Sequence, residues 1–131
     1  MYTEMILDYY KFPRNFGTLE KADIKSRDTN PLCGDEIEFQ INLDENKKVK
    51  EVKYSGKGCA ISQAAASMLT ELMQGKTVDE LKKISKGDIY DLLGITLSPV
   101  RVKCALLGLK VMKIGVYTYL SEEIKLDEDE K

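Results

Sequence analysis

The sequence predicts an α+β fold, in which helices pack on one face of a small three-stranded antiparallel sheet. Residues 36–43 alternate between polar and apolar side chains, as a half-buried strand does. A short polar turn and a second strand follow directly, which is typical of an antiparallel meander. The rest of the chain has helical spacing, and strands followed by helices are characteristic of α+β domains.

The chain begins with a short predicted helix at residues 3–11. Thr3 is a suitable N-cap, and Pro13 prevents the helix from continuing. The Asn-Phe-Gly segment at 15–17 predicts a turn.

The clearest predicted strand is 36–43, and its apolar face carries Ile37, Phe39, Ile41 and Leu43. A polar turn at 44–48 leads into a second strand at 49–55. Residues 22–28 alternate only weakly and are the candidate for the outer strand of the same sheet.

The remaining elements are predicted helices. Residues 62–74 have apolar side chains at helical spacing, and Gly75 suits the position after the helix end. A capping box opens a short helix at 77–85, and residues 85–93 form a further helical turn or two. Ser98, followed by proline, caps a long helix that runs to about residue 120. One domain is therefore predicted over 1–131, with about 122–131 as a flexible acidic tail.

Composition narrows the classes of function. The chain has 131 residues, of which 32% are charged and 43% hydrophobic, as is usual for a globular domain. The net charge of −2 argues against nucleic acid as a partner, and no apolar run is long enough to span a membrane. The start of the chain shows no export signal, so its free thiols predict a cytoplasmic location.

The candidate site residues are three cysteines: Cys33, Cys59 and Cys104. An odd number excludes complete internal disulfide pairing, and the chain has no histidine to act as a metal ligand or base. Cys33 lies in a Pro-Leu-Cys-Gly-Asp turn, and Cys59 lies just before a helix whose N-terminus favours the thiolate. Cys104 shares an apolar helical stripe, so a purely structural role in the core is an alternative for it.

Asp35 extends this set of possible ligands. It follows Cys33 by two residues, so on an extended chain both side chains point to the same side. Three thiolates and one carboxylate form a set that zinc accepts tetrahedrally, and soft thiolates also suit iron–sulfur clusters. Since clusters usually have four cysteine ligands, a weaker oxygen ligand predicts a site that releases what it binds. A carboxylate at a turn, with no role in binding, is the alternative for Asp35.

The chain resembles the U-type iron–sulfur cluster assembly proteins: IscU, SufU and the amino-terminal domain of NifU. The likeness extends from Tyr2 to about Tyr119. It is carried by an opening YTEMILDYY at 2–10 and by the motifs CGD at 33–35, GCAIS at 58–62, ASMLTE at 66–71 and RVKCALL at 101–107.

The resemblance implies roles for individual residues. Cys33, Cys59 and Cys104 would be the ligands of a metal or cluster, and Asp35 the acidic residue that tunes cluster release. Lys103 stands where IscU proteins have a histidine and SufU proteins a lysine, yet the insertion that SufU proteins carry before this point is missing. Residues 97–101 match only loosely the Leu-Pro-Pro-Val-Lys segment recognised by dedicated Hsp70-type chaperones, so the resemblance does not predict such a chaperone as a partner.

Two functions follow from the resemblance. As a scaffold rather than an enzyme, the protein would accept sulfur from a cysteine desulfurase and iron from a donor, hold a nascent [2Fe–2S] cluster and transfer it to apo-proteins. As a SufU-like sulfurtransferase, it would hold Zn²⁺ on Cys33, Asp35, Cys59 and Cys104. Fe²⁺ could occupy the same ligands. Arg101 and Lys103 are expected to stabilise the Cys104 thiolate, which makes Cys104 the candidate sulfur acceptor.

Overall fold

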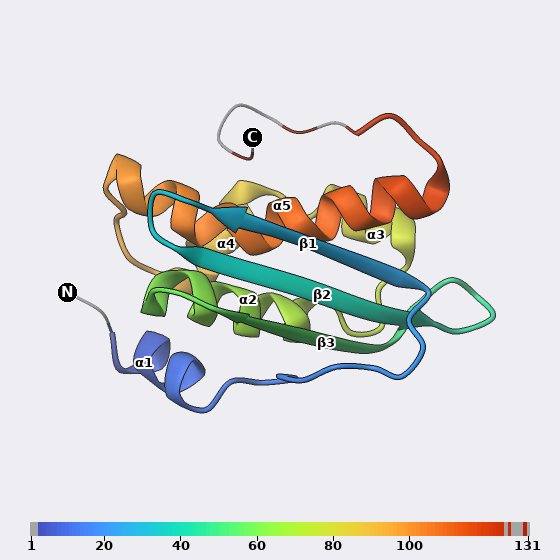
Figure 1. Ribbon diagram of the computed structural model, residues 1–131, viewed down its shortest axis with the longest axis horizontal. Coiled ribbons are helices and arrows are strands. Elements are labelled where there is room, and N and C mark those ends of the chain that lie inside the picture. Colours follow the sequence, from blue (N-terminus) through green and yellow to red (C-terminus); the bar gives the residue numbers. More distant parts are fainter. Residues whose placement is uncertain (1–2, 125, 127–129, 131) are drawn as a thin grey trace.

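A computed structural model describes residues 3–124, 126 and 130. The elements in this part of the chain are α1 (Glu4–Lys11), β1 (Ile24–Asn30), β2 (Asp35–Leu43), β3 (Val49–Lys57), α2 (Ala60–Met73), α3 (Val78–Lys83), α4 (Lys86–Leu93) and α5 (Pro99–Leu120). The predicted α+β class is confirmed, and every predicted element is present (Figure 1).

The sheet is antiparallel with strand order β1-β2-β3. The central strand β2 places Ile37, Phe39 and Ile41 on the buried face, as the alternation predicted. The weakly predicted outer strand is β1, which runs to Asn30 and pairs that residue with Asp35. Strand β3 continues to Lys57, two residues beyond its predicted end, because its pairing with β2 extends to Glu36.

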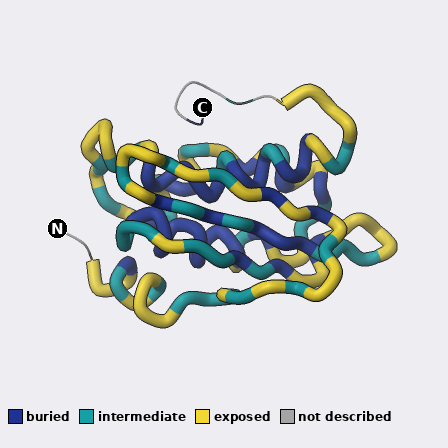
Figure 2. Tube along the Cα trace, viewed as in Figure 1, coloured by how far each residue is buried: buried dark blue, intermediate teal, exposed yellow. Residues whose placement is uncertain are grey.

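The helices cover one face of this sheet. Helix α5 packs against β1 and β2, helix α2 packs against β3 and α5, and α1 packs on α2. Figure 2 shows the buried segments gathered between the sheet and these helices, whereas the connecting loops are exposed. The core is therefore a single layer between the sheet and α2 with α5.

The helix starts follow the predicted caps, with one difference. Thr3, Thr77, Ser85 and Ser98 are the N-caps of α1, α3, α4 and α5. Helix α2 begins two residues before its predicted start, because the Cys59 thiol, rather than a hydroxyl or carboxylate, acts as its N-cap.

Four segments that are distant in sequence meet at one end of the sheet. The β1–β2 hairpin, the end of β3, the start of α2 and the start of α5 all lie at the left of Figure 1. Because Cys33, Cys59 and Cys104 belong to three of these segments, the fold brings the candidate ligands to this end.

The predicted acidic tail falls partly outside the described residues, since 125, 127–129 and 131 are not described. Glu130 is described and is buried, with its carboxylate 2.8 Å from the Lys113 ammonium of α5. Among the described residues, no helix is long and apolar enough to cross a membrane.

The close approach of α5 to β1 yields a stability prediction at Gly115. A Cβ at this position would lie 2.9 Å from side-chain carbons of both Ile24 and Ser26. We expect Gly115→Ala to lower the free energy of unfolding by about 1–3 kcal/mol, because overpacking outweighs the better helix propensity of alanine. Urea unfolding measures the change.

The matched control is Gly87→Ala in α4, where the nearest atom to the new Cβ is the Ser85 hydroxyl oxygen at 3.5 Å. This variant should be neutral or more stable by up to about 1 kcal/mol. Equal stabilities for the two variants would contradict the close packing of α5 on β1.

Candidate functional site

Asp35 is the first residue of β2 and the centre of the site. It has the same parity along the strand as Ile37 and Phe39, so its side chain faces the core and is fully buried. Its Oδ1 atom accepts a hydrogen bond of 2.8 Å from the backbone N–H of Cys59. The carboxylate therefore joins the start of β2 to the start of α2.

Cys33 lies in the four-residue loop that connects β1 and β2. Its backbone N–H donates to the Asn30 carbonyl oxygen at 3.2 Å, which closes a β-turn over Pro31 and Leu32. The half-buried thiol lies 2.7 Å, sulfur to sulfur, from Cys104.

Cys104 projects from the second turn of α5 and is fully buried. Its thiol lies 3.7 Å from the Val100 carbonyl oxygen of the preceding turn. Burial raises the pKa of this thiol, and the hydrogen bond to Cys33 and the acidic groups of Cys59 and Asp35 raise it further.

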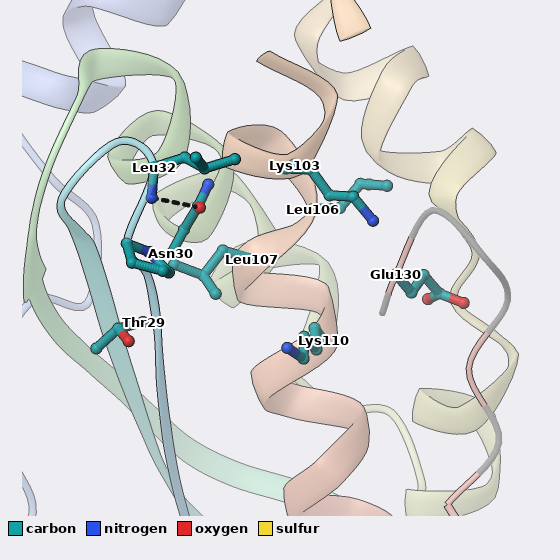
Figure 3. Close-up of a pocket in the computed structure, with 9 residues that line it drawn as sticks. Thr29, Asn30, Leu32, Lys103, Leu106, Leu107, Lys110 and Glu130 are labelled. Carbon is teal, nitrogen blue, oxygen red and sulfur yellow. Dashed lines mark hydrogen bonds between the residues drawn. The ribbon is translucent and has the colours of Figure 1, made fainter. Parts of the chain in front are cut away.

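This direction differs from the expectation that Arg101 and Lys103 would favour the Cys104 thiolate. Lys103 is exposed, and Figure 3 shows its side chain on α5 directed away from Asn30 and Leu32. Adjacent residues on a helix do not share a face, and burial of the Cys104 sulfur is the largest cause of the raised pKa. Burial therefore favours the neutral thiol form of Cys104.

Cys59 is half-buried and forms the opposite side of the site. Its sulfur accepts the Ser62 N–H at 3.5 Å as the N-cap of α2. The same sulfur lies 4.0 Å from Asp35 Oδ2. The predicted position at a helix N-terminus is confirmed.

The structure brings the predicted ligands together unequally. Ligand atoms of Cys33, Asp35 and Cys104 all lie within 4.8 Å of one another, a geometry suited to one metal ion. The Cys59 sulfur contacts only the Asp35 carboxylate among these ligand atoms and therefore lies at the edge of the group. Two thiols and a carboxylate at one point, with a third thiol beside them, fit Zn²⁺ or the iron of a cluster.

Comparison with known proteins shows the family of the chain. Residues 1–125 match the family model of the NifU-like N-terminal domain. The chain belongs to this family. It is thereby a member of the IscU–SufU group of iron–sulfur cluster assembly scaffolds, as the sequence motifs predicted.

Relatives of both kinds are similar to this NifU-like chain. The zinc-dependent sulfurtransferase SufU of Bacillus subtilis is 36% identical over 133 residues, covering 88% of this chain and 89% of its own. The iron–sulfur cluster assembly scaffold protein IscU of Aquifex aeolicus is 34% identical over 131 residues, covering 99% of this chain and 83% of its own. The crystal structure of a SufU protein from Fervidobacterium islandicum superposes with a TM-score of 0.73 at 32% identity, covering 88% of this chain and 96% of that one.

The sequence analysis missed Asn30 as a residue of the site. Its side-chain amide nitrogen lies 3.9 Å from the Cys104 sulfur, although the two residues are 74 positions apart. The available signal was the Asn-Pro pair just before Cys33, which indicates a turn but not the contact with α5.

The contact between Asp35 and Gly58 yields a prediction about metal binding. Gly58 has a φ of +146°, and a Cβ there would lie 2.1 Å from Asp35 Oδ1. We expect Gly58→Ala to displace the carboxylate and to weaken Co²⁺ binding at least about tenfold, as loss of a ligand's supporting contact does. A titration against a competing chelator measures the affinity.

Gly34→Ala is the matched control, because Gly34 also has a positive φ, +68°, but nothing lies within 4 Å of the new Cβ. Both variants pay for an unfavourable backbone conformation, and only Gly58→Ala disturbs Asp35. If the two variants bound Co²⁺ equally well, the role given to this close approach would be wrong.

Proposed function

We propose that the protein is a scaffold on which iron–sulfur clusters are assembled. It would accept sulfur from a cysteine desulfurase and iron from a donor, hold a nascent [2Fe–2S] cluster and transfer it to apo-proteins. The observation that carries the proposal is the convergence of Cys33, Asp35 and Cys104 within 4.8 Å, with Cys59 beside them. Iron and the cluster are cargo in this function.

The mixed ligand set supports temporary binding. Cys33, Cys59 and Cys104 would supply three thiolates, one fewer than a permanent cluster site usually has. Asp35 would supply the fourth ligand as a harder oxygen donor, which binds the soft cluster iron less firmly. Cys59 is half-exposed at the edge of the site, so the bound cluster would be accessible to a recipient protein.

Sulfur would enter by thiol exchange with the desulfurase. An acceptor thiolate attacks the outer sulfur of the desulfurase persulfide, a new S–S bond forms, and the desulfurase cysteine leaves as a thiolate. We propose Cys104 as the acceptor, with Lys103 supplying positive charge beside this turn of α5. Burial raises the pKa of the Cys104 thiol, and a metal ion held by these residues would favour the thiolate that the attack needs.

A zinc-dependent sulfurtransferase is the second candidate function. It is favoured by Lys103, the residue type of SufU proteins at this position, and by the likeness to the SufU of Bacillus subtilis. In this function Zn²⁺ would stay on Cys33, Asp35, Cys59 and Cys104. One thiolate would leave the metal during sulfur transfer, and no cluster would form.

Anaerobic reconstitution separates the two functions. We expect a cysteine desulfurase, cysteine and Fe²⁺ to produce the visible absorption of a [2Fe–2S] cluster on the protein. Replacing any one of Cys33, Cys59 or Cys104 by serine should abolish this absorption, because each supplies a ligand. Zinc-dependent stimulation of desulfurase turnover with no cluster absorption would favour the transferase instead.

The release role of Asp35 gives a separate prediction. We expect Asp35→Ala to slow transfer of the cluster to an apo-ferredoxin and to lengthen the lifetime of the cluster, because the labile oxygen ligand is gone. The variant also loses the hydrogen bond from Cys59, which is expected to lower the free energy of unfolding by about 1–3 kcal/mol. Transfer is followed by circular dichroism and stability by urea unfolding.

Asp35→Asn is the matched control, because the amide oxygen still accepts the Cys59 N–H while the negative charge is removed. It should recover most of the lost stability and still transfer the cluster slowly. A cluster less stable in both variants than in the parent would rule out the release role.

A further inference from the structure

Asn30 contacts the site through both ends of its side chain. Its Oδ1 atom accepts the Leu32 backbone N–H at 3.2 Å, the dashed line in Figure 3. Its Nδ2 atom donates toward the Cys104 sulfur at 3.9 Å. An asparagine that accepts from the backbone two residues ahead forms an Asx-turn, so the first contact shapes the loop and the second reaches another element.

The backbone of Asn30 adds to these contacts. Its carbonyl oxygen accepts the Cys33 N–H at 3.2 Å, and its partner across the β1–β2 pairing is Asp35. Asn30 thus touches the Cys33 turn, stands opposite Asp35 and contacts the sulfur of Cys104. Asn30 and Cys33 thus both link the hairpin to the second turn of α5.

Asn30 lies at the edge of a surface pocket and not in the hydrophobic core. It is half-buried and lines a pocket of about 240 Å³ between the β1–β2 hairpin and α5, which Lys103 and Leu107 line from the helix (Figure 3). A shorter side chain would enlarge this pocket rather than open a cavity in the core. Its contacts with the site can therefore be altered without unpacking the fold.

The chemistry of an amide N–H beside sulfur is specific. Hydrogen bonds to thiolate ligands withdraw electron density from sulfur and help to set the potential of a bound cluster. Partners of this kind also orient the ligand, and their loss typically weakens metal binding. At Cys104 the neighbouring groups Cys33, Cys59 and Asp35 are all acidic, so a neutral donor offsets the negative charge that accumulates when they ligate a cation.

We propose that Asn30 is a positioning residue of the site. Its side-chain oxygen fixes the loop that presents Cys33, and its amide N–H orients the Cys104 sulfur and lowers its electron density. The two sulfurs are thereby held for joint coordination of one cation. This inference rests on the ligand set of the proposed function.

Two substitutions separate the two contacts. Asn30→Ala removes both, whereas Asn30→Asp keeps an oxygen that can accept the Leu32 N–H and removes the donor to Cys104. Co²⁺ is the probe, because its affinity and its thiolate-to-metal charge-transfer absorption can both be measured without cluster assembly.

We expect Asn30→Ala to bind Co²⁺ about 10- to 100-fold more weakly than the parent, because the Cys33 loop is no longer fixed. Asn30→Asp should retain an affinity closer to that of the parent. In both variants the charge-transfer absorption should move to longer wavelength, because sulfur without the N–H donor gives up an electron more easily. A change in packing alone would not produce this shared shift.

Thr29→Ala is the matched control, since Thr29 is exposed and lines the same pocket (Figure 3). It should leave both the affinity and the absorption at the parent values. Unfolding of the metal-free proteins, followed by circular dichroism, shows whether each variant folds.

Parent-like affinity and absorption in both Asn30 variants would overturn the positioning role while leaving the ligand set intact. A parent protein whose Co²⁺ shows no thiolate absorption, or whose absorption keeps its full intensity and wavelength in Cys33→Ser, would overturn the ligand set and the positioning role together.

Discussion

The hydrogen bond from the Cys59 backbone to the Asp35 carboxylate is the constraint on which the site depends. It spans Gly58, where a side chain would collide with the carboxylate, and ties the first residue of β2 to the N-cap of α2. A fully buried carboxylate needs such a partner, and the dipole of the following helix also favours its negative charge. The same bond therefore fixes the Cys59 turn and keeps an oxygen ligand inside an otherwise apolar end of the core.

The three thiols around this carboxylate differ in their exposure to solvent and in the hydrogen bonds that each would lose on binding a metal ion. Cys104 is buried and Cys33 shares a hydrogen bond with it, so these two form the inner side of the site. Cys59 is half-exposed and caps α2, a contact that sulfur makes only weakly because it is a poor acceptor. An outer thiol that is only weakly held, together with an oxygen ligand at the centre, suits a site from which a cation or cluster departs. The proposed scaffold function uses this property to release its cargo, whereas the proposed transferase function needs only one thiolate to come free.

The secondary structure was predictable because its signals are local. The alternation in β2, the capping boxes at Thr77 and Ser85, and the Ser-Pro start of α5 each depend on a few neighbouring residues. Two element ends were missed for different reasons: β3 extends as far as its pairing with β2, a tertiary contact, whereas α2 begins at a local cap made by a thiol, which is not one of the usual capping groups. The net direction of the Cys104 pKa was likewise not predictable from its basic sequence neighbours, because burial of the sulfur is the largest cause.

The sequence by itself determined the fold class, the order of the elements, the family and the identity of the candidate ligands, because each is encoded in short motifs or in periodicity. Only the tertiary structure decided how these ligands are arranged: Asp35 at the centre, Cys33 and Cys104 in contact, and Cys59 at the edge. The contact between Asn30 and Cys104 was also decided only by the tertiary structure, since the two residues are 74 positions apart. Local pattern places a residue on a strand or helix, whereas the distance between two such residues depends on the packing of the hairpin against α5.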